Sequence, residues 1–376
     1  MTVIGIVLLA AAAALGILIY RYVRRTAAAY GLDTDRFRVK LVLLAATVGI
    51  VLLTADFTSA PSAVCWHFLT AALLTELADR IVRKCSGERY ETDCRVWHRL
   101  VARGLIPLAL TAVILTWGMI NMYHVVETRY SLTTEKEIRD EGWRVILIAD
   151  VHYGVLPGRQ ALIGKCAEIS EKHPDVVILC GDIVDNETAP EEVEEAFAAF
   201  GSIRAKHGVY YVYGNHDRST ERLPAGFSDE FLKNAIESSG IRILQDETLA
   251  LEGGMTLIGR EDYYAPRNGR ERKPLSELLR GTDRNSFLMV LDHQPREYAE
   301  NVEQQTDLIL SGHTHAGQLF PAGIVEEIIG FCDGVYGLYE PGGSTRAIVT
   351  SGFAGWTYPF RTERVSEYVT VDISRE

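Results

Sequence analysis

The pattern of apolar and polar positions divides the chain into two unlike parts. In residues 1–124, four long apolar runs alternate with short charged segments. These runs cover residues 3–20, 41–55, 61–78 and 104–122. An apolar helix of about 20 residues crosses a hydrocarbon core of roughly 30 Å. The pattern therefore predicts a bundle of about four transmembrane helices. The run 61–78 is the weakest of the four, because it contains His67 and Glu76, for which we expect polar contacts between helices.

After a polar segment at 125–142, which we interpret as a linker, the pattern changes to short β-rich runs alternating with helical stretches. Strands are predicted at 143–149, 176–180, 209–213, 255–258, 286–291, 308–310, 347–350 and 368–371. Helices are predicted at 160–172, 190–205, 229–239, 274–280 and 295–302. Alternating strands and helices indicate βαβ units. The later strands have fewer helices between them, which favours a second or mixed sheet in a domain that covers residues 143–376.

Charge separates the same two parts and gives the first an orientation. The 376 residues carry a net charge of −12, but residues 1–124 hold 13 Lys/Arg and 8 Asp/Glu, so the remainder is strongly acidic. Basic residues gather in the loops 21–40 and 80–103, whereas the short link around Asp56 has none. Because basic loops stay in the cytoplasm, we expect both chain ends outside the cytoplasmic membrane. The prediction is a multi-pass membrane protein with an extracytoplasmic C-terminal domain.

Composition excludes several classes of function. An acidic soluble domain argues against nucleic acid as a partner, since non-specific binding depends on neutralising phosphates with Lys/Arg. The six cysteines form no C-x-x-C pair, which argues against a zinc-thiolate site and a disulfide framework. Cys180 is interpreted as a small buried strand residue.

Polar residues follow four of the predicted strands directly. The motifs are Asp150-Val-His152, Gly181-Asp182-Ile-Val-Asp185, Gly214-Asn215-His216-Asp217 and Gly312-His313-Thr-His315. The carboxyl ends of neighbouring parallel strands meet at one edge, where open α/β sheets bind their ligands. Oxygen and imidazole donors without thiolates suit Mn, Fe or Zn, and the set is large enough for two ions that share a carboxylate. Any of these histidines taken alone is more often a hydrogen-bonded structural residue.

In wording and order, these motifs resemble those of the calcineurin-like metallophosphoesterases. Residues 316–321 and the late segment 352–361 resemble a membrane-anchored bacterial branch of that family. His293, in Asp292-His-Gln-Pro295, occupies the place of the lone histidine that this family has before the last motif. The resemblance covers about residues 143–373. It implies a two-sheet α/β/β/α metallophosphoesterase sandwich and two divalent metal ions.

The resemblance also implies a role for each matching residue. Four residues would hold the first metal: Asp150, His152, Asp182 and His315. Asp182 would bridge to the second metal, which Asn215, His293 and His313 would also hold. His216 would act on the scissile phosphate, with Asp217 orienting its ring, while a metal-bridging hydroxide attacks phosphorus. Asp185 is interpreted as a residue that orders its own loop or a ligand.

We therefore expect a membrane-anchored, dinuclear metal-dependent phosphoesterase that cleaves phosphodiester, phosphomonoester or pyrophosphate bonds. Its expected substrate is an envelope lipid or a cell-wall polymer, and the lipid bilayer is its second partner. Two alternatives stay open: a cytoplasmic-facing pyrophosphatase of a nucleotide-linked lipid, and a non-catalytic membrane receptor or scaffold.

Two later features remain ambiguous in the sequence. The apolar stretch 319–331 is expected to pack on the core, or else to form a lip that admits lipid-linked substrates. Arg361 is either a phosphate contact or an ordinary exposed arginine.

Overall fold

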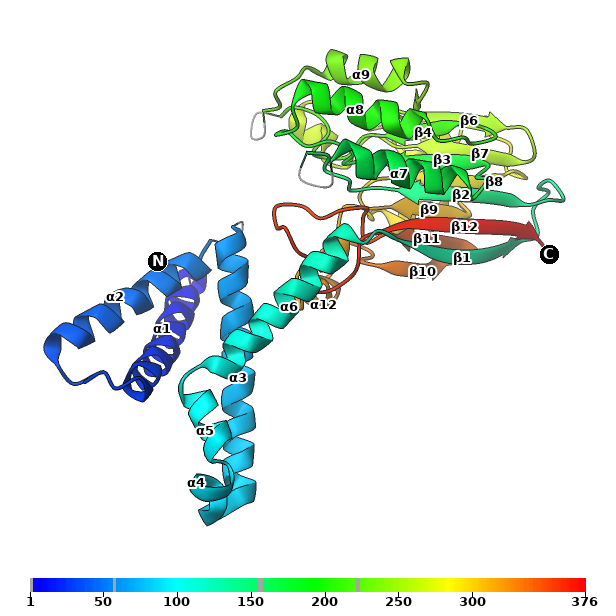
Figure 1. Ribbon diagram of the computed structural model, residues 1–376. Helices are drawn as coiled ribbons and strands as arrows, with labels where there is room; N and C mark the ends of the chain where they lie inside the picture. The colour runs from blue at the N-terminus through cyan, green and yellow to red at the C-terminus, as the bar shows by residue number, and fades with distance from the viewer. Residues whose placement is uncertain (1–2, 57–58, 155–157, 221–223) are drawn as a thin grey trace. The chain divides into compact units, whose positions relative to one another are not determined.

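The computed structural model describes residues 3–56, 59–154, 158–220 and 224–376. It contains two compact units, residues 1–117 and 118–376. Figure 1 shows the elements of each unit.

The N-terminal unit is helical. Its elements are α1 (Val3–Ala29), α2 (Phe37–Thr54), α3 (Ala60–Ser86), the 3₁₀ turn η1 (Gly87–Arg89), α4 (Tyr90–Asp93), α5 (Arg95–Ala102) and most of α6 (Leu105–Tyr123). All four expected spans fall on helices. Within the described residues, however, only α2 and α6 are long and apolar enough to cross a membrane. The prediction of about four spans is therefore not confirmed.

The charged residues of α3 explain why this helix does not count as a membrane span. This helix carries Glu76 and Asp79 towards its C-terminal half, followed by Arg80, Arg83 and Lys84. The side chains of residues 3–11 in α1 lie outside the described residues, so the span 3–20 is only partly tested. Glu76 forms an ion pair with Arg25 of α1, as expected for a polar contact between helices.

The C-terminal unit contains two six-stranded sheets. The first has the order β1-β12-β2-β3-β4-β5, and the second has the order β10-β11-β9-β8-β7-β6. The first-sheet strands are β1 (Val126–Thr134), β2 (Trp143–Ile148), β3 (Val176–Cys180), β4 (Val209–Val212), β5 (Arg242–Ile243) and β12 (Glu367–Arg375). The second-sheet strands are β6 (Glu247–Leu251), β7 (Met255–Gly259), β8 (Phe287–Leu291), β9 (Leu308–Ser311), β10 (Gly337–Gly342) and β11 (Thr345–Val349). In the first sheet β2 to β5 are parallel, and in the second β7, β8, β9 and β11 are parallel.

The alternation of side chains along β2 explains why two layers meet here. Val145 and Leu147 face the apolar core between the sheets, whereas Ile146 and Ile148 face the core under the helices. All four are fully buried, because successive strand side chains point to opposite faces and both faces are covered. Predominantly parallel sheets with two covered faces need such continuous apolar strands.

Helices complete the outer layers. On the first sheet lie α7 (Arg159–Ser170), α8 (Pro190–Gly201) and α9 (Asp229–Ser238), as Figure 1 shows. Short helices α10 (Leu275–Leu278) and α11 (Tyr298–Glu303) contribute to the core on the outer face of the second sheet. The remaining elements are η2 (Ala265–Asn268), η3 (His315–Gly317) and α12 (Ala322–Ile329). The layers are α/β/β/α, as the two-sheet sandwich prediction required.

The expected linker at 125–142 is wrong in its first half. Residues 126–134 form β1, which pairs in parallel with β12 over nine residues, from Val126 opposite Glu367 to Thr134 opposite Arg375. Only Leu132 and Thr134 of β1 are buried, so the strand is polar on its open side and lacks a continuous apolar run. The compact unit accordingly begins at Gly118, within α6, instead of at residue 143.

Candidate metal centre

The predicted ligands converge where strands of both sheets end. Asp150 follows β2, Asp182 follows β3 and Asn215 follows β4, all from the first sheet. The second sheet contributes His293 after β8 and the 313–315 segment after β9. The two sheets therefore supply different ligands to one place, at the carboxyl ends of their parallel strands.

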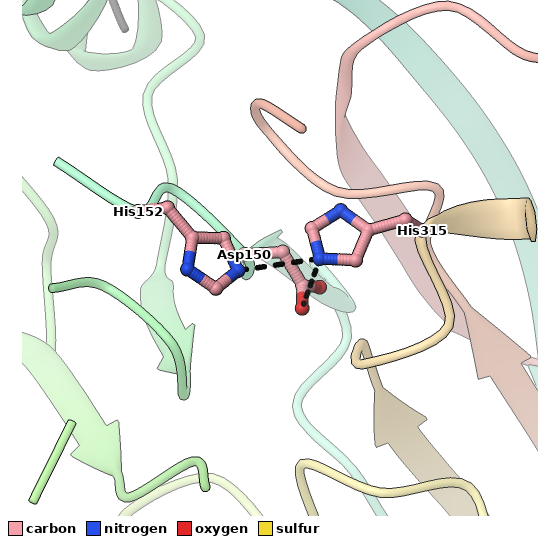
Figure 2. Close-up of side chains that lie close together, drawn as sticks. All are labelled: Asp150, His152 and His315. Atoms are coloured by element: carbon pink, nitrogen blue, oxygen red, sulfur yellow. Dashed lines mark hydrogen bonds and ion pairs between the residues drawn. The ribbon is translucent and has the colours of Figure 1, made fainter. Parts of the chain in front are cut away.

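One group of candidate ligands, the first triad, consists of Asp150, His152 and His315. A ligand atom from each lies within 4.8 Å of those of the others, and all three residues are buried. Figure 2 shows the two rings turned towards each other and towards the carboxylate. The Nε2 atoms of His152 and His315 are 3.2 Å apart, and His315 Nε2 is 3.6 Å from Asp150 Oδ1. Two nitrogens that share an ion at about 2.1 Å lie roughly 3.0–3.4 Å apart, so the spacing suits one ion.

The second triad consists of Asp182, His293 and His313, with the same 4.8 Å limit between ligand atoms. His293 Nε2 lies 3.0 Å from Asp182 Oδ2. That same carboxylate oxygen is 3.9 Å from His152 Nε2 in the first triad. Asp182 thus stands between the two groups, which is the position that a shared carboxylate needs.

Asn215 has a buried polar atom without a partner, as expected of a further ligand. Its Oδ1 is buried and has no hydrogen-bond partner. A buried acceptor left unpaired costs on the order of 1–3 kcal/mol, and a bound cation removes that cost.

The ligand rings are held in one tautomer by their other nitrogens. His293 Nδ1–H donates to the Cys180 carbonyl (2.8 Å), and His315 Nδ1–H donates to the Ala354 carbonyl (3.3 Å). His152 Nδ1–H donates to Asp185 Oδ2 at 2.9 Å. In each ring Nε2 keeps its lone pair for an ion, the usual arrangement of metal-binding histidines. Asp185 is thereby a support for a ligand ring, as expected.

The backbone at this site adopts conformations that side chains rarely take. Asp150, His152, Asp182, His313 and His315 all have φ between 43° and 73°. Such left-handed residues cost of order 1–3 kcal/mol each and cluster at functional sites. Close approach also fixes a glycine, because a Cβ at Gly312 would lie 2.2 Å from Asp150 Oδ2. Position 312 therefore requires glycine.

Burial and mutual charge shift the pKa values of these groups in opposite directions. Burial raises the pKa of Asp150 to about 6, although neighbouring imidazoles oppose the shift. Burial and the charge of His293 lower the pKa of His313 to about 3, which keeps its ring neutral. For Asp182, burial alone would raise the pKa, but His293 and His216 hold it well below the usual value. Clustered carboxylates and imidazoles with such opposed shifts are typical of functional sites.

His216 lies beside the first triad. Its ring is 5.3 Å from that of His152 and 4.9 Å from that of Trp356, and its buried Nδ1 has no hydrogen-bond partner. The neighbouring carboxylate is that of Asp185, whose Oδ1 lies 3.8 Å from His216 Nδ1.

Asp217 has different partners from those expected. Its carboxylate accepts hydrogen bonds from the backbone N–H groups of Asp182, Ile183, Val184 and Gly214, at 2.6–3.2 Å. It therefore fixes the turn that presents Asp182 instead of orienting the ring of His216.

The fit to divalent ions follows from these contacts. Two fully buried aspartates, four converging imidazoles and an orphaned amide oxygen form a donor set of oxygen and nitrogen without sulfur. Buried carboxylates at such density are costly unless cations compensate them. The residues present therefore fit two ions of the Mn, Fe or Zn type.

Comparison with known proteins shows to which family residues 144–317 belong. Residues 144–317 match the family model described as calcineurin-like phosphoesterase. This region is a calcineurin-like metallophosphoesterase domain. The resemblance inferred from the motifs is confirmed.

Two relatives and one solved structure illustrate the similarity. An uncharacterised metallophosphoesterase of Helicobacter pylori J99 is 30% identical over 61% of this chain and 59% of its own. A Danio rerio transmembrane protein with metallophosphoesterase domain is 29% identical over 71% of this chain and 62% of its own. The chain thus spans less than two thirds of these relatives. A dimetal phosphatase from Danio rerio aligns with a TM-score of 0.36 and 14% identity, over 57% of this chain and 88% of its own.

The two interpretations of Arg361 as a phosphate contact or an exposed arginine are both wrong. This residue is neither exposed nor available to phosphate: it is fully buried, and its guanidinium donates to four backbone carbonyls. These belong to His315, Ser351, Ala354 and Arg364. Arg361 therefore holds the segment behind His315 in place.

Two residues near the site were missed in the sequence. Trp356 packs against His216 although it is 39% exposed. Arg296 stacks on Tyr263, whose ring neighbours that of Tyr264 beside His313. Neither lies in a ligand motif, but Arg296 follows His293 by three residues, which is the one local signal that could have indicated it.

Proposed function

We propose that this protein is a dinuclear metal-dependent phosphoesterase. The observation that carries the proposal is the meeting of two ligand triads at one carboxylate, with Asp182 Oδ2 3.0 Å from His293 and 3.9 Å from His152. Two neighbouring cation sites in a phosphoesterase domain are suited to phosphoryl chemistry.

The proposed ligand roles follow the two triads. Asp150, His152, Asp182 and His315 would hold the first ion, and Asp182, Asn215, His293 and His313 the second. When bound, such a pair supplies Lewis-acid polarisation of a phosphoryl oxygen and makes bound water more acidic. His216 would donate a hydrogen bond or a proton to the leaving oxygen, as its unpartnered Nδ1 and its place beside His152 allow. Asp217 would keep Asp182 in position through the backbone.

The activity is tested with the full chain in detergent micelles, loaded separately with Mn²⁺, Fe²⁺ and Zn²⁺. Hydrolysis of p-nitrophenyl phosphate and bis(p-nitrophenyl) phosphate would be measured for the wild type, His216→Ala and His124→Ala. His124 is an exposed histidine outside both triads and serves as the matched control. We expect His216→Ala to lower kcat about 100-fold or more, and His124→Ala to change it little. Full activity in His216→Ala would remove that residue from the mechanism, and an inactive wild type would favour a receptor or scaffold.

We further propose that the domain works at a membrane surface. Supporting this, α6 is one of two helices in the described part of the chain that are apolar enough to span a bilayer, and its last residues lie in the same compact unit as the metal centre. The Arg361 N–H donates to the Gly118 carbonyl at 2.9 Å, and Ser366 Oγ donates to the Met122 carbonyl at 2.9 Å. The end of this helix is therefore bonded to the segment that also supports His315.

An apolar ridge continues from this segment. The N–H groups of Phe320 and Gly323, around the start of α12, donate to the side chains of Thr362 and Glu363 at 3.1 and 2.9 Å. The ridge is formed by Phe320, Ile324, Val325, Ile328, Ile329 and Phe331, each at least 44% exposed. The expectation that this stretch packs on the core is wrong. Contiguous exposed apolar residues bonded to a membrane-helix end are suited to insertion among lipid headgroups.

The proposed substrate is accordingly a phosphate ester or pyrophosphate carried by an envelope lipid or cell-wall polymer. Replacing Ile328 and Ile329 with Ser tests the ridge, because both side chains are exposed and their loss should leave stability nearly unchanged. We expect hydrolysis of a lipid phosphate in vesicles to fall about 10-fold or more, while bis(p-nitrophenyl) phosphate is cleaved as before. Unchanged turnover of the vesicle substrate would contradict the role of the ridge.

The extracytoplasmic orientation is tested by thiol labelling in intact cells. Exposed Cys85, near the end of α3, reports on the basic segment 80–103, and Ser374→Cys would report on the catalytic domain. Half-buried Cys65 and Cys94 would be replaced by Ser, and Cys166, Cys180 and Cys332 are buried. We expect an impermeant maleimide to label residue 374 and to spare Cys85. The reverse pattern would favour the alternative, a cytoplasmic-facing pyrophosphatase of a nucleotide-linked lipid.

A further inference from the structure

Arg296 differs from the other arginines around the second-sheet end of the site. Three of these neighbours have carboxylate partners: Arg218 pairs with Glu261, Arg260 with Glu297 and Glu300, and Arg272 with Asp292 and Glu297. Among the described residues, Arg296 has no carboxylate within 4.0 Å, and its Nε is buried without a hydrogen-bond partner. A half-buried guanidinium left unpaired is costly, which indicates that its partner comes from outside the chain.

The position of Arg296 links the second triad to the apolar ridge. Its guanidinium lies over the ring of Tyr263 at 5.1 Å and over that of Phe331, the last ridge residue, at 5.5 Å. The ring centroids of Tyr263 and Tyr264 are 5.6 Å apart, and those of Tyr264 and His313 are 6.4 Å apart. The positive charge of Arg296 also helps to lower the pKa of His313, as expected of near neighbours.

The backbone holds this arrangement. The Arg296 N–H donates to the Gln294 carbonyl at 2.8 Å, so the arginine is set by the turn that carries His293. The Asp333 N–H donates to the Pro295 carbonyl at 2.9 Å, which joins this turn to the chain after Phe331. A guanidinium that lies over aromatic rings has its planar fork pre-organised, and this fork matches phosphate oxygens in pairs.

We propose that Arg296 binds a second phosphate group of the substrate, next to the phosphate held at the metal centre. The substrate class is then a diphosphate ester, and this inference rests on the proposed phosphoesterase function. The scissile phosphate has the two triads and His216 to neutralise it, whereas Arg296 lies outside both triads and is free to bind the adjoining anion. Its contact with Phe331 puts the organic part of a lipid diphosphate within reach of the ridge.

The test compares Arg296→Gln and Arg296→Lys with Arg267→Gln in the full chain in detergent micelles. Arg267 is the matched control, because it is exposed and stacks on Tyr264 at 4.5 Å without touching the turn after His293. KM and kcat would be measured with farnesyl diphosphate, methyl diphosphate and bis(p-nitrophenyl) phosphate. Binding of methyl diphosphate would be measured separately by calorimetry, so that Arg296 is tested even if no ester is hydrolysed.

We expect Arg296→Gln to raise KM and the dissociation constant for diphosphates about 10- to 100-fold, as loss of a charge-assisted pair of hydrogen bonds predicts. Arg296→Lys should recover part of this loss, and bis(p-nitrophenyl) phosphate should change less than about 3-fold. A loss with both diphosphates would identify the diphosphate group as what Arg296 binds, and a larger loss with farnesyl diphosphate would add a contribution of the lipid part. A loss confined to farnesyl diphosphate would overturn the proposal, because both compounds carry the second phosphate. No loss with either, or an equal loss with bis(p-nitrophenyl) phosphate, would overturn the proposal.

Discussion

The two triads of the metal centre sit in unlike surroundings. The first is enclosed: Asp150 and His152 are fully buried, Asp185 supports one ring, and Arg361 holds the chain behind His315. The second is partly open, since His313 is only half-buried and faces Tyr264. Beyond it lie the unpaired Arg296 and the ridge. Two arginines illustrate the difference. The guanidinium of Arg361 donates to four backbone carbonyls, whereas that of Arg296 has no carboxylate partner among the residues that the structure describes.

This contrast assigns different tasks to the two sides. On the enclosed side, which we call the wall, Asp185 and Arg361 are bonded within the chain, so that changes to them should affect stability and ion binding. The open side, which we call the mouth, consists of His313, Arg296 and the exposed ridge, so that changes to Arg296 and the ridge should affect substrates more than the fold. Asp182, between the triads, should be sensitive to both.

Asp182→Asn is expected to have the largest effect. Its Oδ2 approaches both His152 and His293, so loss of the negative charge weakens both ion sites at once. Activity should fall about 1,000-fold or more, equivalent to roughly 4 kcal/mol of barrier. Phosphatase assays and metal analysis would measure this, with exposed Asp140→Asn as the control. Retained activity in Asp182→Asn would show that the triads do not work as one centre.

Arg361→Met is the next largest change, and it tests the wall. Removing the guanidinium takes the donor from the Ser351 and Arg364 carbonyls. It also removes one of the two donors to each of the His315 and Ala354 carbonyls. The expected loss is about 3–5 kcal/mol, which is about a 10 °C fall in Tm for a domain of this size. Arg296→Met, on the open side, should shift Tm by no more than about 2 °C. Thermal unfolding followed by tryptophan fluorescence compares the two, and equal shifts would erase the distinction between wall and mouth.

Asp185→Asn is expected to weaken one ion site selectively. The Asp185 carboxylate accepts the Nδ1–H of His152 in the first triad, whereas His293 in the second donates to a backbone carbonyl. Loss of such a supporting carboxylate typically lowers metal affinity about 10- to 100-fold. Titration with Mn²⁺ should then resolve one weakened and one unchanged site. Equal weakening of both sites would mean that Asp185 acts on the centre as a whole.

The smallest expected effect is a pH dependence confined to the mouth. Burial, together with Glu363, raises the pKa of half-buried Glu326 of α12 from 4.5 to about 7. A carboxyl whose pKa is higher in the folded protein favours folding while protonated. Its contribution is fully present below about pH 4.5 and is lost as the pH rises through about 7. After allowance for solvent screening, Glu326→Gln should stabilise the protein by about 1 kcal/mol at pH 8 and hardly at pH 5.

The Tm of wild type and Glu326→Gln, measured at both pH values, checks this. Arg361→Met serves as the comparison, and its deficit should persist at both. A Glu326→Gln gain that is equal at pH 5 and pH 8 would exclude titration of this carboxyl as its cause.

Much of the site could be predicted because its signals are local. Each ligand follows directly on an apolar strand, and parallel strands bring their carboxyl ends together whatever their order in the sheet. Asp150 and His315 are 165 positions apart, yet both follow this rule. The buried strands β3 and β8 were equally clear, since both of their faces are covered and the residues form unbroken apolar runs.

The rest depended on contacts that the sequence does not reveal. Strand β1 is polar on its open side and is paired with β12, some 240 residues later. Nothing in the sequence around Arg361 indicates that four backbone carbonyls surround it. Likewise, nothing around Arg296 indicates that the nearby carboxylates are already paired with other arginines. The partners of Asp217 likewise depend on how the turn after β3 folds over it. The length of α3 made a membrane span plausible, but the charged residues near its end make its composition too polar.

The most direct test of the central claim is the metal content of the purified full-length chain at saturating Mn²⁺, measured together with its hydrolysis of bis(p-nitrophenyl) phosphate. We predict two ions per chain, with activity that is lost on chelation and returns as the second site refills. One ion or fewer per chain in an active protein, or two ions in a protein that cleaves no phosphate ester or diphosphate, would contradict the account.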